Sequence, residues 1–440
     1  MGIKSFTPFL KKNCPEAFKD LPYSYFKGKR VAVDSDNVFR KLMARAHKEI
    51  VNETDVCSKE PDRNKIVKNW LSHVKDEISK FLKYGITLIF VFDGAYIDEK
   101  SETQLKRREE KQKRINDVEE LKNKILSIDE LERTPAMVTE LRKKMHHQGT
   151  IKPEDKELLI NILKTLGFPV LIATEEGEKL CAMLNLEGKV FAVYSRDSDI
   201  IAMGCPISFF QESGYVYNEE TKKTELSLAC TFFKPILSAL EIEYETFLDL
   251  AVMSGNDFNS NIYNLGVGKA YKLLKEYKNI DNLPAKFDQS KAILNHVRCR
   301  EIFGRQNSVD ICKTEIILDL NFKNNREEIK QYGIIDWMDD LEILLKNLPV
   351  PSNIFVDKTP SLKSSSVRLK VINKVEEDNK EEEKTEEEKQ KPIIPEQKAS
   401  PKKINMKIVS SLNSQQLLKV KEKINVQSKE KIITLKIIKS

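Results

Sequence analysis

Four short apolar runs in this chain each end at acidic residues, and this pattern restricts the fold more than any other feature. Each run is rich in Val, Ile, Leu or Phe, which favours a buried strand. The runs and their acids are Arg30–Val33 with Asp34, Ile86–Phe92 with Asp93, Pro169–Ala173 with Glu175, Glu176 and Glu178, and Lys189–Tyr194 with Asp197 and Asp199. Helical patterns such as Lys65–Lys83 and Lys156–Leu166 lie between the runs. Buried strands that alternate with helices predict a parallel, doubly wound α/β sheet.

The predicted sheet brings these acids to one edge. In parallel sheets, ligands bind in the crevice beyond the carboxyl ends of the strands. A single acid after a strand is most often a turn residue or a helix N-cap. Four strand ends with the same chemistry favour a shared site instead. Because carboxylates gathered so closely repel one another, we expect cations between them.

The chemistry of these ligands indicates both the metal and the reaction. Oxygen ligands without a nearby His or Cys suit Mg²⁺ or Mn²⁺ rather than zinc. Two such ions a few Å apart activate a water and stabilise the leaving oxygen of a phosphodiester. The chain has neither a His-Glu-x-x-His motif nor a Walker lysine loop, which argues against a zinc hydrolase and a P-loop NTPase. We therefore expect metal-dependent hydrolysis of a phosphodiester.

A glycine-rich segment near the middle of the chain supports a phosphate-containing substrate. Asn264–Ala270 reads NLGVGKA and precedes an expected helix at Tyr271–Tyr277. Glycines let the backbone approach a phosphate, and a helix N-terminus offers free N–H groups. A Gly-x-Gly alone is more often a turn, but this one follows Asp257 closely and has the pattern of a helix-hairpin-helix phosphate clamp. The candidate DNA contacts in it are Gly266, Gly268 and Lys269.

Several motifs, in order along the chain, resemble those of the structure-specific 5′ nucleases of the flap endonuclease/XPG family. The MGIKSF start resembles the family's N-terminus, and VAVDSD and VFDGA resemble its two N-terminal Asp motifs. EEGEKLCAML resembles its Glu-x-Glu motif, YSRDSDIIAMG its Asp-x-Asp motif, and SGNDFNSNIYNLGVGKAYKLL its last catalytic Asp with the adjoining helix-hairpin-helix. The resemblance covers about residues 1–345. It implies a PIN-like, doubly wound, mostly parallel sheet with a helical gateway or arch and a C-terminal helix-hairpin-helix region.

The resemblance also implies the site residues. The metal ligands would be Asp34, Asp93, Glu176, Glu178, Asp197, Asp199 and Asp257. They would hold two Mg²⁺ ions, for which Mn²⁺ can substitute. Lys100 and Arg107 would project from the gateway over the active site, where they stabilise charge on the scissile phosphate and hold the leaving group. Gly2 would lie near the active site and contact DNA. Glu175 is left out of the ligand set and assigned to the helix start, where it stabilises the helix dipole.

The sequence departs from the family pattern at two places. Phe39 and Arg40 stand where flap endonucleases carry a tyrosine that stacks on a substrate base, so we consider both as candidates for stacking there. The tail lacks the Gln-x-x-Leu-x-x-Phe-Phe sliding-clamp motif, because Lys421 and Glu422 occupy the positions of the two Phe residues. We therefore expect no clamp binding through this peptide. The short segment between the gateway and the Glu motif favours flap-endonuclease-like geometry over the long spacer of XPG itself.

Composition and motif positions divide the chain into five regions. These are an N-terminal nuclease region (1–115), a helical arch or cap (116–150), an internal nuclease region (151–245), a helix-hairpin-helix DNA-binding region (246–355) and a charged, disordered tail (356–440). The tail is rich in Ser, Lys and Glu, with EEDNKEEEKTEEEKQK at its centre, which is typical of disorder. The nearly continuous charge over 100–124, without Gly or Pro, predicts a long solvated helix or a mobile arm.

Composition and charge are those of an intracellular protein. Lys and Arg number 74 and Asp and Glu 68, so the formal net charge of +6 is only modestly basic. Seven scattered cysteines without a Cys-x-x-Cys pair indicate a reducing compartment. No secretory signal and no membrane-spanning run are present. We expect a monomer without a membrane partner, in the nucleus or at a viral replication site. The abundance of Lys, Ile and Asn suits an A/T-rich genome, such as that of a large DNA virus.

Three functions follow from these features. The leading hypothesis is a Mg²⁺-dependent, structure-specific DNA endonuclease that cleaves at 5′ flaps or branched junctions in replication or repair. The second is a 5′→3′ exonuclease of the same family that acts on duplex ends or RNA, which the missing tyrosine keeps open. The third is a non-catalytic junction-binding scaffold, against which the complete set of carboxylates argues.

Overall fold

A seven-stranded mixed sheet forms the centre of the fold. In sheet order its strands are β1 (Phe18–Pro22), β7 (Lys223–Phe232), β6 (Ile207–Asn218), β5 (Ala192–Tyr194), β2 (Arg30–Asp34), β3 (Thr87–Phe92) and β4 (Val170–Ile172). The five strands from β6 to β4 run parallel, whereas β7 and β1 pair antiparallel. The predicted doubly wound, mostly parallel α/β sheet is therefore confirmed.

The computed structural model describes residues 2–95, 100–219, 221–321, 326–334, 336–349, 404–409 and 433–438. The chain divides into two compact units, Met1–Lys370 and Val371–Ser440. In the second unit, β8 (Ile404–Val409) pairs in parallel with β9 (Ile433–Ile438). The rest of the tail predicted over 356–440 lies outside the described residues, so its disorder stays a prediction.

The four strands predicted from apolar runs all form. Every residue of β3 and of β5 is buried, which explains why these strands read as continuous apolar runs. Strand β2 lies between them, with Val33 opposite Phe90 of β3 and Tyr194 of β5. The carboxyl ends of β2, β3 and β5 therefore lie side by side.

Three strands lacked a clear sequence signal. Strands β6 and β7 form a long hairpin whose far half is exposed and carries Tyr215 and Tyr217 on its surface. Strand β1 pairs with β7 at the edge of the sheet. Polar residues interrupt the alternation in the far half of β6, so periodicity alone did not indicate it.

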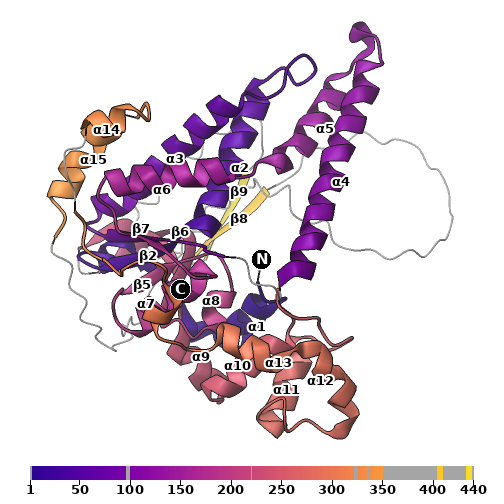
Figure 1. The fold of residues 1–440 in the computed structure, drawn as a ribbon, viewed down its shortest axis with the longest axis vertical. Helices are drawn as coiled ribbons and strands as arrows, with labels where there is room; N and C mark the ends of the chain where they lie inside the picture. Colours follow the sequence, from indigo (N-terminus) through magenta and orange to yellow (C-terminus); the bar gives the residue numbers. More distant parts are fainter. Residues whose placement is uncertain are drawn as a thin grey trace. The chain divides into compact units, whose positions relative to one another are not determined.

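Helices cover both faces of the sheet (Figure 1), and each face has its own hydrophobic core. One core includes α2 (Ser35–Glu53), α3 (Arg63–Lys83), α6 (Pro153–Thr165) and α15 (Asp336–Lys346). The other includes α1 (Phe6–Asn13), α7 (Gly177–Leu186), α8 (Asp199–Ala202), α9 (Phe233–Leu240), α10 (Tyr244–Met253), α11 (Val267–Tyr277) and α13 (His296–Phe303). Two shorter helices also contribute to these cores: α14 (Arg326–Lys330) places Ile329 in the first, and α12 (Asp288–Leu294) places Leu294 in the second. No helix among the described residues is long and apolar enough to cross a membrane.

The charged stretch after β3 is a single long helix, α4 (Ser101–Leu126), with α5 (Pro135–Met145) packed beside it (Figure 1). Its Glu, Lys, Gln and Arg residues are good helix formers. Only Val118 and Ile125 of α4 are buried, and they pack in a small cluster with Leu141 and Met145 of α5. The predicted solvated helix is thus observed, and the boundary placed after residue 115 lies within it.

The glycine-rich segment opens α11 four residues earlier than predicted. The helix begins at Val267 rather than Tyr271, with Gly266 as its extended N-cap residue. Buried Val267 and Ala270 anchor this first turn on the core, which the local Gly-x-Gly pattern did not reveal. Gly268 and Lys269 consequently belong to the first turn of α11, and α10 packs against this helix.

Candidate active site and metal centre

The acids predicted at the strand ends lie where the sheet meets the helices that follow. Asp34 ends β2, and Asp93 follows β3 directly. Glu176 is the N-cap residue of α7, and Glu178 lies in its first turn. Asp197 follows β5, and Asp199 begins α8. Parallel pairing of β2 with both β3 and β5 is what brings these separate sequence motifs to one edge.

Three of these acids form a compact group that could hold a metal ion. Carboxylate oxygens of Glu178, Asp197 and Asp199 all lie within 4.8 Å of one another. Asp199 is 1% exposed, and its Oδ1 has no hydrogen-bond partner among the described residues. An unpaired buried carboxylate oxygen is costly unless a cation compensates it. The residues present therefore fit a hard divalent cation with oxygen ligands.

Burial and mutual repulsion change the acidity of the site. Burial, followed by repulsion from Asp93, raises the pKa of Asp34 well above its ordinary value. Burial and nearby carboxylates also raise the pKa of Glu178 and of Asp199. For Asp93, burial together with Asp36 and Glu176 raises the pKa to about 6. A bound cation would lower these pKa values again, because metal binding favours the deprotonated ligand.

Hydrogen bonds orient two of the acids. The Ser195 hydroxyl donates to Asp34 Oδ2 at 2.7 Å. The backbone N–H of Gly177, at the start of α7, donates to Asp93 Oδ1 at 2.8 Å. Each bond links a strand end to a neighbouring element, so the carboxylates are held before any ligand arrives.

The base of α4 brings two cations to the acids. Lys100 Nζ donates to Glu176 Oε2 at 2.6 Å and lies 4.7 Å from the centre of the Phe258 ring. Although burial opposes its charge, the Glu178 and Glu176 carboxylates raise the pKa of Lys100. Arg107 donates from Nη2 to both carboxylate oxygens of Asp257, at 2.9 and 2.7 Å. The structure thus places both predicted gateway cations, and Asp257, at the acidic edge.

Gly2 lies so close to the acids that no larger residue would fit at its position. A Cβ at this position would lie 2.0 Å from Asp197 Oδ1 and 2.8 Å from Asp199 Oδ1. The backbone φ of +93° also belongs to a region that side chains disfavour. The next residue is fixed as well, because the Ile3 N–H donates to Ser198 Oγ at 2.9 Å.

The two candidates for base stacking differ sharply in exposure. Phe39 is 2% exposed and packs in the core beside Phe90, with ring centres 5.9 Å apart. This burial argues against Phe39 as a DNA contact, because α2 turns its side chain towards the sheet. Arg40, the next residue, is exposed. Of this pair, only Arg40 lies on the surface.

The helix-hairpin-helix candidates lie on an open surface. A Cβ added at Gly266 or Gly268 would meet no heavy atom within 4 Å. Lys269 is exposed, and its Nζ donates to the backbone oxygen of Asn264 at 2.9 Å. Both glycines are themselves exposed.

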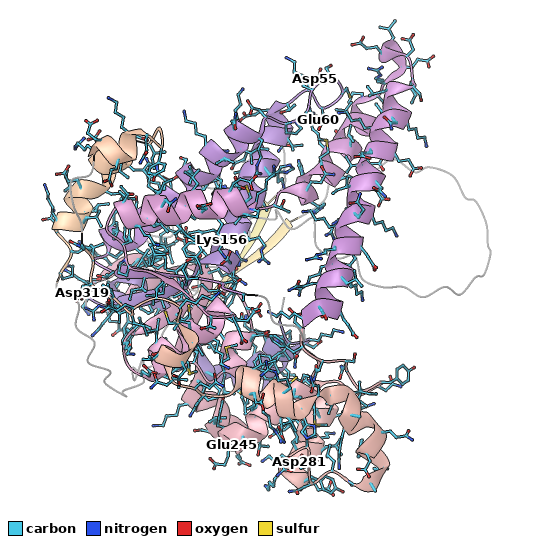
Figure 2. The ribbon with its side chains drawn as sticks, in the orientation of Figure 1. Asp55, Glu60, Lys156, Glu245, Asp281 and Asp319 are labelled. Carbon is cyan, nitrogen blue, oxygen red and sulfur yellow. The ribbon has the colours of Figure 1, made fainter. Side chains whose placement is uncertain are left out.

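Two residues of this region were missed by the sequence reasoning, Asp36 and Lys156. Asp36 lies two residues after Asp34 in the VAVDSD motif, so the motif itself carried a signal. Lys156, in the first turn of α6, lies 120 residues further along the chain (Figure 2). Its ammonium group donates to Asp36 Oδ2 at 2.8 Å. No sequence pattern indicated this pairing.

Comparison with known proteins identifies the family. The XPG N-terminal domain model matches residues 1–114, and the XPG I-region model matches residues 167–257. Flap endonuclease 1-1 from Paramecium tetraurelia is 30% identical over 287 residues, which span 64% of this chain and 67% of that protein. The chain belongs to the flap endonuclease/XPG family. The family resemblance of its motifs is thereby confirmed, and members of this family are metal-dependent nucleases.

Other members of the flap endonuclease/XPG family match with similar identity. A probable RAD2-like endonuclease from Invertebrate iridescent virus 6 is 27% identical over 361 residues, which span 72% of this chain and 83% of that protein. For flap endonuclease 1 from Cryptosporidium parvum the identity is 29%, and the match spans 66% of this chain but 57% of that protein. A solved structure of flap endonuclease-1 from Methanococcus jannaschii matches 75% of this chain and 96% of its own, with 23% identity and a TM-score of 0.47.

Proposed function

We propose that this protein is a Mg²⁺-dependent, structure-specific DNA endonuclease that cleaves a phosphodiester at 5′ flaps or branched junctions. One observation carries the proposal: Lys100 and Arg107, both from the base of α4, reach the same acidic edge that the strand ends form. An acidic metal site beneath two fixed cations suits a phosphodiester, whose charge increases in the transition state. The family's flap endonucleases supply the substrate class.

The metal would be held by acids of the described site. Glu178, Asp197 and Asp199 form its centre, since their oxygens already lie within 4.8 Å of one another. We assign the remaining ligand positions to Asp34, Asp93, Glu176 and Asp257. When bound, two Mg²⁺ ions activate a water and stabilise the leaving oxygen. Because several of these acids have a raised pKa, metal affinity should increase with pH as they lose their protons.

The two cationic side chains at the base of α4 are already positioned at the acidic edge, where they could bind a phosphate. Each is paired with an acid, Lys100 with Glu176 and Arg107 with Asp257. Arg107 is 42% exposed, so its guanidinium is open to a scissile phosphate, whereas Lys100 is 13% exposed and lies deeper in the site. Lys100 stays protonated at neutral pH because its pKa is raised, so it acts as a fixed positive charge and not as a base.

The DNA on either side of the cut would be held through its backbone. The N-terminus of α11 offers free N–H groups next to Gly266 and Gly268, with Lys269 beside them. Exposed Arg40 takes the place of the base-stacking tyrosine. Phosphate contacts carry no sequence information, so cleavage should be independent of sequence and should weaken as salt increases. We expect the protein to act as a monomer on nuclear or viral DNA. We expect no binding to a sliding clamp through a Gln-x-x-Leu-x-x-Phe-Phe motif.

The deciding experiment is cleavage of an end-labelled 5′-flap DNA in Mg²⁺, beside a blunt duplex and a 5′-RNA flap. The test variants are Asp199→Asn, which keeps the shape of the buried side chain but removes its charge, and Asp199→Ala. The matched control is Glu175→Gln, at an acid of the same motif that is not assigned as a ligand. We expect one cut at the flap base for the wild type and the control, and none for the Asp199 variants.

Other outcomes would change the assignment. Stepwise digestion of the blunt duplex would identify a 5′→3′ exonuclease. Tight junction binding without cleavage would identify a scaffold. Mg²⁺-dependent cleavage that survives in Asp199→Ala would show that the metal centre is wrongly placed.

A further inference from the structure

The backbone of Asp93 is held from both sides by two side chains that lie outside the assigned ligand set. Asp36, in the first turn of α2, accepts the Asp93 backbone N–H at its Oδ2, at 2.8 Å. Lys156, in the first turn of α6, donates from Nζ to the Asp93 backbone oxygen at 3.0 Å. The same Nζ donates to Asp36 Oδ2 at 2.8 Å, so the two side chains close a ring around one peptide segment.

From this geometry we propose that Asp36 and Lys156 form a clamp that positions the metal ligand Asp93. The inference rests on the proposed function, because it assigns a role within the same metal centre. Asp36 and Lys156 are positioning residues, since they act through the backbone of the proposed ligand. Outer partners of this kind orient metal ligands and tune their affinity.

The position of Asp93 explains why such a clamp is needed. Asp93 follows the last residue of β3, so the sheet no longer pairs its backbone through the regular ladder. Its carboxylate accepts one bond, from the Gly177 N–H to Oδ1. The clamp satisfies the backbone N–H and C=O, and leaves the second carboxylate oxygen available as a ligand. Three helices, α2, α6 and α7, therefore each contribute one contact that fixes the position of Asp93.

The surroundings of Lys156 favour positioning over contact with DNA. Its side chain is 27% exposed, and that of Asp36 is 16% exposed. The ammonium group already has two oxygen acceptors and lies 5.7 Å from the centre of the Phe92 ring. A lysine that binds DNA phosphate would be expected to extend into solvent, as exposed Lys164 on the same helix does. Lys164 is therefore a suitable control.

The test compares Lys156→Met, Lys156→Arg and Lys164→Met in the full-length protein. The first measurement is the Kd for Mn²⁺ without DNA, by electron paramagnetic resonance. The second is kcat and KM for the 5′-flap DNA in Mg²⁺, and a thermal melt checks that each variant is folded. We expect Lys156→Met to raise the Mn²⁺ Kd and lower kcat, each by about 10-fold or more, with KM unchanged. Arginine, which keeps the charge and the donors, should restore much of both, and Lys164→Met should behave as the wild type.

A second variant tests whether the pair acts as a unit. Asp36→Ala should have an effect similar to that of Lys156→Met. The double variant should lose no more Mn²⁺ affinity and no more kcat than the more impaired of the two single variants. The effects of two residues in one network do not add. Full additivity of the two losses would contradict the clamp.

Each of two alternatives predicts a different result for the Mn²⁺ Kd. If Lys156 contributed only charge, its removal would make the acidic site more negative and tighten Mn²⁺ binding. If it contacted DNA, Lys156→Met would raise KM and reduce the salt dependence of binding, with the Mn²⁺ Kd unchanged. Either result would overturn the proposal. If the wild type does not cleave the flap, the proposed function fails, but the Mn²⁺ Kd still decides whether the clamp positions a metal ligand.

Discussion

Removal of the metal should make the stability of this protein depend on pH through Asp93. Burial, with Asp36 and Glu176, raises the pKa of this carboxyl from its ordinary 3.8 to about 6. The folded protein therefore binds this proton more tightly than the unfolded chain does. Its stability is complete at low pH and declines as pH rises through the window from 3.8 to about 6.

The size of the effect follows from that pKa difference. At pH 8 the ionised carboxylate costs about 3 kcal/mol of the free energy of unfolding, since each tenfold change in proton affinity is worth about 1.4 kcal/mol. At pH 5 about half of this cost is present, because ionisation in the folded state is still incomplete. Between pH 5 and pH 8 the loss due to Asp93 is therefore on the order of 1–2 kcal/mol.

The assay is urea unfolding in a metal chelator at pH 5 and pH 8, for the wild type and for Asp93→Asn. Asparagine can still accept the Gly177 N–H at Oδ1 but cannot ionise. Groups far from the site titrate equally in both proteins, so they cancel in the comparison. Asp34 does not cancel, because Asp93 raises its pKa, and its contribution adds to the difference in the same direction. We expect the wild type to lose roughly 1–2 kcal/mol more than the variant over this range.

Saturating Mg²⁺ at pH 8 supplies the control. A ligand that binds only the folded state stabilises it, so Mg²⁺ should raise the stability of the wild type more than that of the variant. Equal pH dependence in the two proteins, or a wild type that gains stability relative to Asp93→Asn as pH rises, would refute this reasoning.

Two further predictions concern residues near the site. Phe39→Ala should lower the free energy of unfolding by about 3–5 kcal/mol because it leaves a core cavity, whereas Arg40→Ala should change it by about 0.5 kcal/mol or less; urea unfolding measures both. A stable Phe39→Ala protein with weakened flap binding would instead restore Phe39 as a DNA contact. Gly2→Ala should reduce kcat by up to about 100-fold, because its Cβ would lie 2.0 Å from Asp197 Oδ1 and displace a ligand. Cleavage at the wild-type rate, with the initiator methionine and the N-terminal sequence verified by mass spectrometry, would contradict that role for Gly2.

The central strands and the acids at their ends could be predicted from sequence because both are local patterns. A strand buried on both faces must be apolar throughout, as β3 and β5 are. Parallel pairing then brings the ends together without further information, which is why Asp34, Asp93 and Asp197 converge. The long charged helix α4 could be predicted for a similar reason, since few of its residues are buried and its helix formers act locally.

Only the tertiary structure decided which side chains of a helix are buried and which distant residues meet, because both depend on how one element is rotated and placed against another. The choice between Phe39 and Arg40 is a difference of one residue on α2, and only packing on the sheet shows which side chain is buried. The start of α11 depends on Val267 meeting the core. Lys156 reaches Asp36 across 120 residues because α6 and α2 pack on the same face of the sheet. Such contacts arise from the relative placement of helices, which hydrophobic periodicity within a segment does not specify.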